Sequence, residues 1–302
     1  MYFTYDDTTV QIGQSKATVL AHSIHAGGLA PIVTWELMYP RYIHSELMTH
    51  RMFSRNAASS RATPTAVLVD EAAKNPVFFD SLTTNQHGMV GADELSAEDA
   101  ALFEAEWQDL AKYVARTVLD WKTRFNLSKQ VVNRALEPFL PIRTIVTATE
   151  LDNFFKLRLA SDAQPEIQSL AKAMHASMKA SKPEELRDYA WHVPYKGLLQ
   201  GGCKDEGDLV IRSVAACARV SVMRGDGKAT SLEEDTAFVR RLYESGHMSP
   251  FEHVAMCLPL HYDDGMCQCS GWSDNFYLWK SARSLLLKSS KQEGLFNRIV
   301  EA

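Results

Sequence analysis

The chain has 302 residues, of which 46% are apolar and 23% charged, and 32 basic against 37 acidic side chains give a net charge of −5. This composition excludes the disordered, fibrous and low-complexity classes. Because the net charge is negative, no long-range electrostatic attraction would draw the chain onto a polynucleotide or an anionic membrane. No apolar run reaches the roughly 18–20 residues of a membrane span, and the first residues are not a cationic, apolar leader. We therefore expect a cytoplasmic protein that holds any anionic ligand locally.

The first third of the chain predicts a strand followed by a short helix. Residues 29–37 are β-branched, aromatic and partly alternating, which is typical of a strand. Side chains over residues 43–54 recur at steps of three and four, which predicts a short helix. That helix is expected to end in a polar loop over residues 55–63, which Pro64 closes.

The middle of the chain predicts three helices. Ser96 and Asp99 resemble a capped helix start. The stripe that follows comprises Phe103, Trp107, Leu110, Val114, Val118 and Trp121. A second helix is expected over residues 150–159, and a third from Ser161 or Asp162 to Met178, with Pro165 in its first turn.

The last third begins after turn formers at residues 191–194 and 201–202. Residues 209–222 are apolar and fit either a helix or a strand. Ser231 and Glu234 form a capping box for a helix that ends at Gly246. Residues 254–261 predict a buried strand that Pro259 interrupts, and therefore one near a sheet edge.

The common nucleotide, hydrolase and metal motifs are absent from this sequence. It contains no GxGxxG, GxxxxGK[ST], GxSxG or HExxH pattern. The cysteines are an odd set, which predicts reduced thiols rather than a disulfide framework. They are Cys203, Cys217, Cys257, Cys267 and Cys269. The Cys267-Gln268-Cys269 spacing is too tight for a zinc knuckle, so we expect no metal site.

The densest polar cluster covers residues 49–61, which contain three arginines, a histidine, an asparagine and three serines. Guanidinium groups, hydroxyls and free backbone N–H groups are what a phosphate monoester requires. A solvated loop in which serine and asparagine only form turns is the alternative that composition leaves open.

The spacing within this cluster resembles the flavin-dependent thymidylate synthase (ThyX) family, whose signature is commonly RHR-x7-S. The matching positions are Thr49, His50, Arg51, Ser54, Asn56, Ser59 and Arg61. Residues 153–167 are similar to that family's NFLxLRxxxxAQxEI helix pair, and Arg134 with Pro138 to its R-x-x-L-P stretch. Residues 215–221 and 247–253 resemble its AARVS and HxSPFEH segments.

The order of these segments differs from the usual family order, in which AARVS and SPFEH precede the RHR motif. Here they follow it, which indicates a circular permutation of the kind associated with phage-borne relatives. Permutation is tolerable when the original termini lie close together. We expect one catalytic domain over residues 1–302, with a helical insertion over roughly residues 66–123 and the permuted segment over roughly residues 203–262.

The resemblance implies an enzyme that methylates C5 of dUMP. It would take a methylene group from 5,10-methylenetetrahydrofolate and a hydride from FAD that NADPH has reduced. Carried over, Ser59, Arg61 and Arg134 would bind the dUMP phosphate and sugar. Arg158 would be the catalytic cation at the uracil ring, and Arg51 would lie at the junction of substrate and cofactor. The FAD site would comprise His50, Arg51, Asn56, Asn153, Ser221, Ser249 and Glu252.

Other interpretations of the same residues stay open. Arg158 fits a buried ion pair, and residues 249–252 fit a simple helix-stop turn. Thr49, Ala57 and Asp162 replace an Arg, a Glu and a flavin-contacting His of the family pattern. These changes leave open dCMP as substrate, a hydroxymethyl product, or a non-catalytic nucleotide- or flavin-binding relative.

The resemblance also implies an α+β fold, a small, mostly antiparallel sheet flanked by helices. The helices expected over residues 96–124 and 150–178 would form its helical half. Family members build their active sites between subunits, so we expect a homo-oligomer, a tetramer, located in the host cytoplasm if the chain is phage-encoded.

Overall fold

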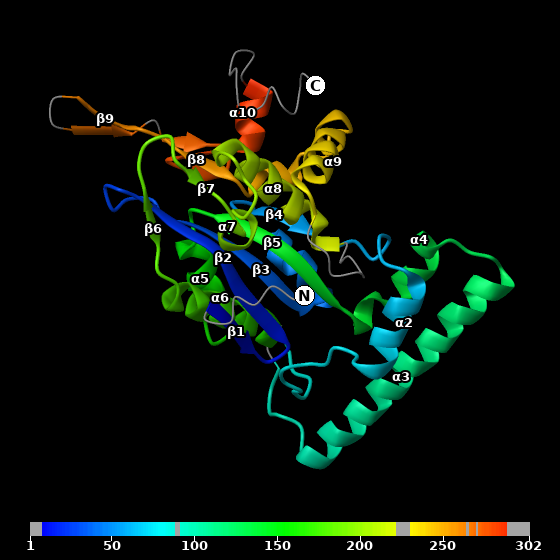
Figure 1. The fold of residues 1–302 in the computed structure, drawn as a ribbon. Helices are drawn as coiled ribbons and strands as arrows, with labels where there is room; N and C mark the ends of the chain where they lie inside the picture. The colour runs from blue at the N-terminus through cyan, green and yellow to red at the C-terminus, as the bar shows by residue number, and fades with distance from the viewer. Residues whose placement is uncertain (1–7, 88–90, 222–229, 264–265, 270, 289–302) are drawn as a thin grey trace.

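The computed structural model describes residues 8–87, 91–221, 230–263, 266–269 and 271–288, and a six-stranded sheet lies at its centre (Figure 1). The strand order is β1-β2-β3-β5-β4, with antiparallel neighbours, and β6 pairs with β2 in parallel. The strands are β1 (Thr9–Ile12), β2 (Ser15–His25), β3 (Ile32–Pro40), β4 (Ser54–Ala57), β5 (Pro141–Ala148) and β6 (Glu184–Leu186). β4 therefore forms one edge of the sheet.

Helices cover both faces of this sheet. Trp35 and Leu37 of β3 pack against α5 (Asp152–Arg158) and α6 (Pro165–Ala180) on one face. On the other face, Ile145 of β5 packs with the residues of α8 (Glu206–Ala218). A strand that is covered on both faces needs apolar residues at successive positions, which explains the nearly continuous apolar run of β3.

The last third of the chain forms a layer over the α8 side of the sheet (Figure 1). Its helical elements are α7 (Lys196–Leu199), α8, η4 (Arg219–Ser221), α9 (Leu232–Glu244), η5 (Ser249–Glu252) and α10 (Ala282–Lys288). A three-stranded sheet joins β7 (Trp191–His192), β8 (Ala255–Cys257) and β13 (Trp279–Ser281). Two hairpins pair β9 (Leu260–Asp263) with β10 (Met266–Cys269) and β11 (Trp272–Ser273) with β12 (Phe276–Tyr277).

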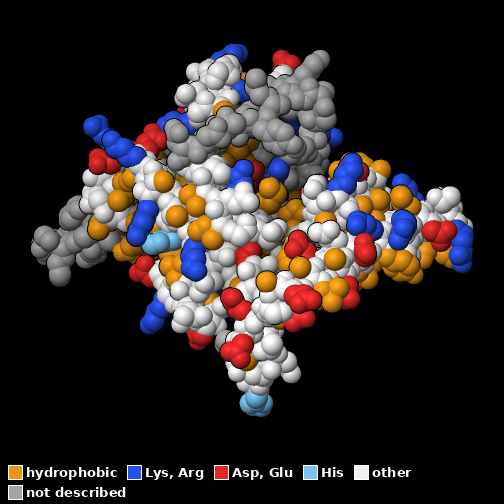
Figure 2. Space-filling model, turned by 90° about the horizontal axis from the view of Figure 1, so that it is seen from below, with side chains coloured by type: hydrophobic (Ala, Val, Ile, Leu, Met, Phe, Trp, Pro, Cys, Tyr) orange, Lys and Arg blue, Asp and Glu red, His pale blue; other side chains and the backbone are white. Residues whose placement is uncertain are grey.

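A helical arm, residues 65–139, projects away from the rest of the chain, which we call the body (Figure 1). The arm contains α2 (Thr65–Lys74), α3 (Ala97–Arg124), α4 (Lys129–Val132) and η3 (Asn133–Phe139). It has its own apolar cluster around Ala111, Ala115 and Leu136. Hydrophobic atoms also gather on its outer surface (Figure 2). Between β3 and β4 the body adds only η2 (Arg41–Ile43) and α1 (His44–Met48).

The structure confirms the fold class and most of the predicted elements. The molecule mixes helices with a mainly antiparallel sheet, as expected. The helices predicted from Ser96, over residues 150–159 and behind the Ser231 capping box are all present. Residues 209–221, for which both a helix and a strand were possible, are helical in α8 and η4, and residue 222 lies outside the described residues. Among the described residues, no helix is long and apolar enough to cross a membrane.

Four predictions about the elements were wrong in detail. Residues 54–57 are a strand because they pair with β5, whereas residue 54 was predicted as the end of a helix and residues 55–57 as part of a loop. The third helix begins at Pro165, where the Gln164 side chain accepts from the Ile167 amide at 3.0 Å, and not at Ser161 or Asp162. β8 is the central strand of its small sheet, since Pro259 lies beyond the paired residues.

The fourth error concerns the predicted stripe of α3. Leu110 is 47% exposed and Trp121 is 39% exposed, whereas Val118 is fully buried. The buried line of the helix runs through Ala111 and Ala115, where small side chains allow α2 and α3 to approach closely. The large side chains thus lie beside the contact and not within it.

Candidate functional site

The predicted site residues lie around the edge strand β4 and at both of its ends. β4 pairs with β5 from Ser54 opposite Thr147 to Ala57 opposite Thr144. The chain before it comes from α1, and the loop after it, residues 58–63, rests against η3. A strand at a sheet edge keeps one side open to other segments. Three segments contact β4 itself or the turns at its two ends.

The first segment is α5, which brings Arg158 to His50. The Arg158 Nε donates to His50 Nε2 at 3.0 Å, and an Nη2 of the same guanidinium donates to the Thr49 hydroxyl at 3.4 Å. Burial, followed by the charges of Arg158 and Arg55, lowers the pKa of His50 to about 4. His50 is therefore neutral at pH 7, with its proton on Nδ1 and its Nε2 lone pair orienting the Arg158 cation.

The aromatic neighbours of His50 fix its ring. Phe154 lies edge-on to the His50 ring with centroids 4.8 Å apart, and Phe53 is 5.8 Å away. An Arg55 Nη1 donates to the carbonyls of Met48 and His50 at 2.9 and 3.2 Å. These contacts hold the turn between α1 and β4, so the His50–Arg158 pair is preorganised.

The second segment is the C-terminal motif region, which Asn56 joins to β4. The Asn56 Nδ2 donates to the Cys217 carbonyl at 2.8 Å, and the Ser249 hydroxyl donates to Asn56 Oδ1 at 3.3 Å. Asn56 thus links the AARVS-like and SPFEH-like segments to the SxNxxSxR-like one. Segments more than 150 residues apart in the chain therefore meet at one side chain.

The third segment is η3, which places Arg134 beside the loop that carries Ser59 and Arg61. Glu137 Oε1 accepts from the Ser60 hydroxyl at 2.6 Å and from Arg134 Nη1 at 3.0 Å. The Asn133 amide donates to the carbonyls of Ser60 and Thr63. The Arg134 side chain is 57% exposed, so its remaining donors are open to a ligand.

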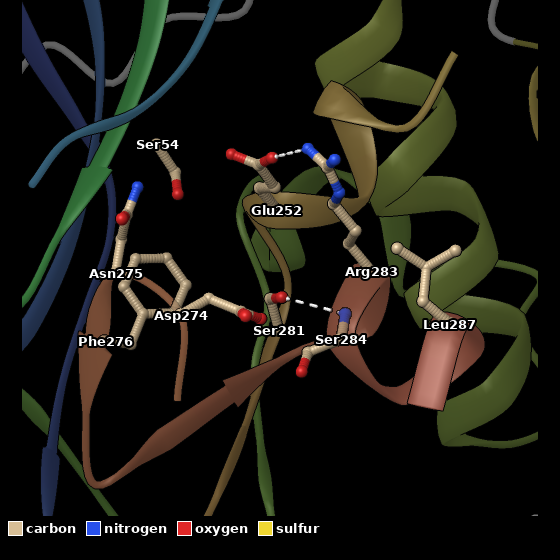
Figure 3. Close-up of a pocket in the computed structure, with 9 residues that line it drawn as sticks. All are labelled: Ser54, Glu252, Asp274, Asn275, Phe276, Ser281, Arg283, Ser284 and Leu287. Carbon is tan, nitrogen blue, oxygen red and sulfur yellow. Dashed lines mark hydrogen bonds and ion pairs between the residues drawn. The ribbon is translucent and has the colours of Figure 1, made fainter. Parts of the chain in front are cut away.

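A cavity of about 320 Å³ lies at the other end of β4 (Figure 3). Ser54 and Glu252, both from predicted motifs, line it together with side chains of β12 and α10. Arg283 Nη1 makes an ion pair with Glu252 Oε1. The second Glu252 oxygen points away from Arg283, toward the side of the cavity where Ser54 and Asn275 lie (Figure 3).

Beneath this cavity, a chain of buried hydrogen bonds crosses the sheet. The His253 Nδ1 bonds to the Thr147 hydroxyl at 2.9 Å, and Thr147 to the Thr34 hydroxyl at 2.7 Å. His192 then bonds to Thr34 through Nε2 and to Ser23 through Nδ1, both at 2.8 Å. Complete burial lowers the pKa of each histidine to about 3, so both are neutral.

Most of the predicted site residues therefore come together, but in two groups. His50, Asn56, Ser249, Glu252 and Arg158 belong to the β4 network. Ser59, Arg61 and Arg134 lie on the η3 side, where Arg61 is exposed.

Three predicted residues stand apart from these contacts. Arg51 and Asn153 are exposed on the surface of the β4 region and of α5. Ser221 ends η4, but its side chain lies outside the described part of the chain.

Sequence reasoning missed several residues of the site. Arg55 had no assigned role, although it ties α1 to β4. Arg283 and Asn275 come from the tail beyond Tyr262, which carries no motif that would have drawn attention to them. Thr49, regarded above as the loss of a cation, accepts from Arg158.

His253 Nε2, next to Glu252 in the chain, is fully buried and has no hydrogen-bond partner among the described residues. The exposed donors of the site fit a flavin nucleotide in one respect. Exposed guanidinium groups at Arg51 and Arg61 flank β4 and suit phosphate oxygens. The described residues contain no cluster of His, Cys, Asp and Glu suited to a metal ion.

Comparisons with known proteins agree with the family resemblance of these motifs. A family model described as "Thymidylate synthase complementing protein" matches residues 30–184. That range includes the cluster at residues 49–61, Arg134 and Arg158, and ends before Ser221, Ser249 and Glu252. No curated protein matches the chain significantly.

Solved structures show only a distant likeness. Thymidylate synthase X from Helicobacter pylori, crystallised with FAD and dUMP, is 18% identical, with a TM-score of 0.35 over 50% of this chain and 71% of that one. The UMP/dUMP methylase PolB from Streptomyces cacaoi, bound with 5-Br UMP, is 14% identical, with a TM-score of 0.40 over 55% of this chain and 92% of that one.

Proposed function

Because the chain belongs to the thymidylate synthase complementing protein family, that of the flavin-dependent thymidylate synthases, we propose that it catalyses the reductive methylation of dUMP at C5 to dTMP. The proposed co-substrates are 5,10-methylenetetrahydrofolate and NADPH. Bound FAD would supply the hydride that this chemistry requires. The observation that carries the proposal is the contact between His50 and Arg158, because it joins two family motifs 108 residues apart into one polar centre.

In this proposal, Arg158 stabilises negative charge that develops on the uracil ring. Its guanidinium is half-buried and is held by His50 and Thr49, so it needs no reorganisation when that charge forms. His50 orients this cation through a lone pair. Because His50 is neutral, it adds no second positive charge beside Arg158.

The η3 side of the site binds the nucleotide phosphate and sugar. Arg134 and Arg61 supply guanidinium donors, and Ser59 supplies a hydroxyl on the same loop. The Glu137 carboxylate fixes Arg134 without covering it. Asn56 keeps the C-terminal motif region against β4, so that the FAD side of the site forms next to the substrate side.

The test is tritium release from dUMP labelled at C5, measured with the folate donor, NADPH and FAD. Arg158→Met is expected to lower kcat by about 10²–10³-fold, the usual loss when one preorganised donor to a developing charge is removed. Lys156→Met, an exposed cation on the same helix, is the matched control and should leave kcat unchanged.

The same assay separates the alternatives. Release from dCMP but not from dUMP would reassign the substrate. A protein that stays colourless with FAD and gains no thermal stability from dUMP would be a non-catalytic relative, and the proposal would fail.

We also propose that the chain forms a homo-oligomer, a tetramer as in the family, and that α3 is one of its contacts. Large apolar side chains are exposed on this helix, among them Leu102, Leu110 and Tyr113 at 60%, 47% and 62%. Charge is segregated along it. Five acidic residues and no basic one lie in its first half, namely Glu98, Asp99, Glu104, Glu106 and Asp109. Its second half has four basic residues, Lys112, Arg116, Lys122 and Arg124, and one acidic residue, Asp120, which pairs with Arg124.

Antiparallel pairing of α3 with α3 of a second copy would place each acidic half against a basic half. Light scattering after size exclusion tests this: Tyr113→Glu should shift the mass downward, whereas Glu98→Gln should not. Glu106→Arg and Arg116→Glu should each weaken the assembly, and the double variant should restore part of it. An unchanged mass for Tyr113→Glu would remove α3 from the interface.

A further inference from the structure

The cavity at Ser54 and Glu252 combines family motif residues with a segment that the family match does not include. Ser54 belongs to β4, inside the matched range, and Glu252 ends η5. Asp274, Asn275, Phe276 and Arg283 come from the C-terminal tail. A volume of about 320 Å³ lies within the usual range for small-molecule pockets, where it suits a ring system.

The charges of the lining residues exclude a phosphate as the occupant. Glu252 and Asp274 carry carboxylates, and the Arg283 guanidinium is paired with one of them. An anion would therefore meet a net negative wall. The cavity suits an uncharged group that donates a hydrogen bond to a carboxylate oxygen.

Glu252 is fixed from three directions. Its backbone lies between Ser249, which bonds to Asn56, and His253, which is fully buried and bonds to Thr147. Arg283 holds one carboxylate oxygen, and the other points toward the Ser54 side of the cavity (Figure 3). The free oxygen is thus a preorganised acceptor that faces the side of the cavity where the Ser54 hydroxyl and the Asn275 amide lie (Figure 3).

We propose that Glu252 accepts the N–H of a cyclic imide, the O=C–NH–C=O edge that a uracil ring and the isoalloxazine of a flavin share. Ser54 and Asn275 would donate to the two flanking carbonyls, and Arg283 is the positioning residue for the carboxylate. Cytosine carries a lone pair at N3, which the carboxylate oxygen repels. Glu252 therefore selects for the imide and against the cytosine ring. This inference rests on the proposed function.

The experiment measures affinity for two pairs of ligands by calorimetry. The wild-type protein is titrated with dUMP and N3-methyl-dUMP, and with FAD and N3-methyl-FAD. Methylation removes the N–H, and a lost hydrogen bond to a charged group weakens binding by about tenfold to a hundredfold. The pair in which methylation weakens binding identifies which imide the cavity holds.

Variants assign the effect to the carboxylate. Glu252→Gln should reduce the discrimination against the methylated ligand to less than threefold, and Arg283→Met should reduce it in part while the thermal midpoint changes little. Where the uracil ring is the occupant, Glu252→Gln also lowers the preference for dUMP over dCMP. Glu244→Gln, an exposed carboxylate on α9, is the matched control and should keep the wild-type ratios.

The outcomes separate this inference from the proposed function. If wild-type protein binds both parent ligands and methylation at N3 weakens neither, the inference is overturned and the proposed function stands. It is also overturned if Glu252→Gln keeps the full discrimination. A wild-type protein that binds neither dUMP nor FAD overturns both. The methylated ligands test the wild-type chain directly, so the result holds even where a variant fails to fold.

Discussion

The body and the arm use apolar side chains in opposite ways. In the body, Trp35, Leu37 and Ile145 are fully buried between two helical layers. In the arm, small alanines fill the contact between helices, while Leu110 and Tyr113 face outward. The body is therefore stabilised by its own core, whereas the arm keeps a large apolar surface for another contact.

The difference also separates two kinds of function. All the contacts among the predicted catalytic and cofactor residues are made in the body, around β4. The arm contributes to the site only at its base, through Arg134 and Glu137 of η3. Changes in the outer arm should therefore alter assembly before they alter the chemistry of the site.

The largest effect is expected from removing a tryptophan in each region. Trp35→Ala should lower the free energy of unfolding by about 3–5 kcal/mol, because it leaves a cavity and removes the 3.2 Å hydrogen bond from the indole N–H to the Ser177 hydroxyl. Trp121→Ala should cost about 1 kcal/mol or less, since this side chain is 39% exposed. Urea unfolding measures both, and equal losses would show that arm and body share one core.

The second largest effect is a pH dependence of the free energy of unfolding that arises from buried histidines in the body. His192 and His253 have pKa values of about 3 when folded, against 6.5 for the free side chain, because burial penalises their charged forms. Below pH 6.5 the unfolded chain binds protons that the folded chain cannot. Stability is therefore complete above pH 6.5 and falls by about 1.4 kcal/mol per pH unit for each histidine, down to about pH 3.

Urea unfolding between pH 7 and pH 5 measures this slope. His192→Gln keeps one donor and one acceptor for Ser23 and Thr34 and should reduce the slope by up to about 1.4 kcal/mol per pH unit. His87→Asn, in an exposed part of the arm, is the control and should leave the slope unchanged. A stability that does not vary between these pH values would contradict the buried neutral state.

The sequence predicted those features that a short stretch of chain determines. The Ser231–Glu234 capping box and the Ser96 cap form as expected, because the contacts span only three residues. The motif around His50 and Asn56 was identified for the same reason. Most of strand β4 was predicted as a loop, since its pairing with β5 depends on residues about 90 positions away.

The unpredicted part of the site depends on contacts between distant segments. Nothing near Arg283 in the sequence indicates that it pairs with Glu252, because the two meet only after β8 and β13 have paired. The exposure of Leu110 and Trp121 could likewise not be predicted from the sequence. Helical periodicity shows which side chains share a face, but not whether another element covers that face.

The smallest change in the free energy of unfolding is expected from removing a helix cap in the body and one in the arm. Ser231→Ala should lower the free energy of unfolding by about 1 kcal/mol. The helix that it caps, α9, packs against α8, and its Asp235 binds Arg212 and Arg219 at 3.4 and 2.7 Å. Losing the first turn of α9 therefore loosens the body.

Ser96→Ala removes the same kind of cap, since Ser96 Oγ accepts from the Asp99 amide at 3.1 Å. The buried residues of α3 begin only at Ala111, so fraying of the first turn exposes little. Amide exchange should accelerate over residues 97–100, while the urea midpoint changes by less than the Ser231→Ala variant shows. A larger loss of stability from Ser96→Ala than from Ser231→Ala would mean that the outer arm unfolds cooperatively with the body. In that case α3 would stabilise the monomer itself and would not serve only as a contact between copies.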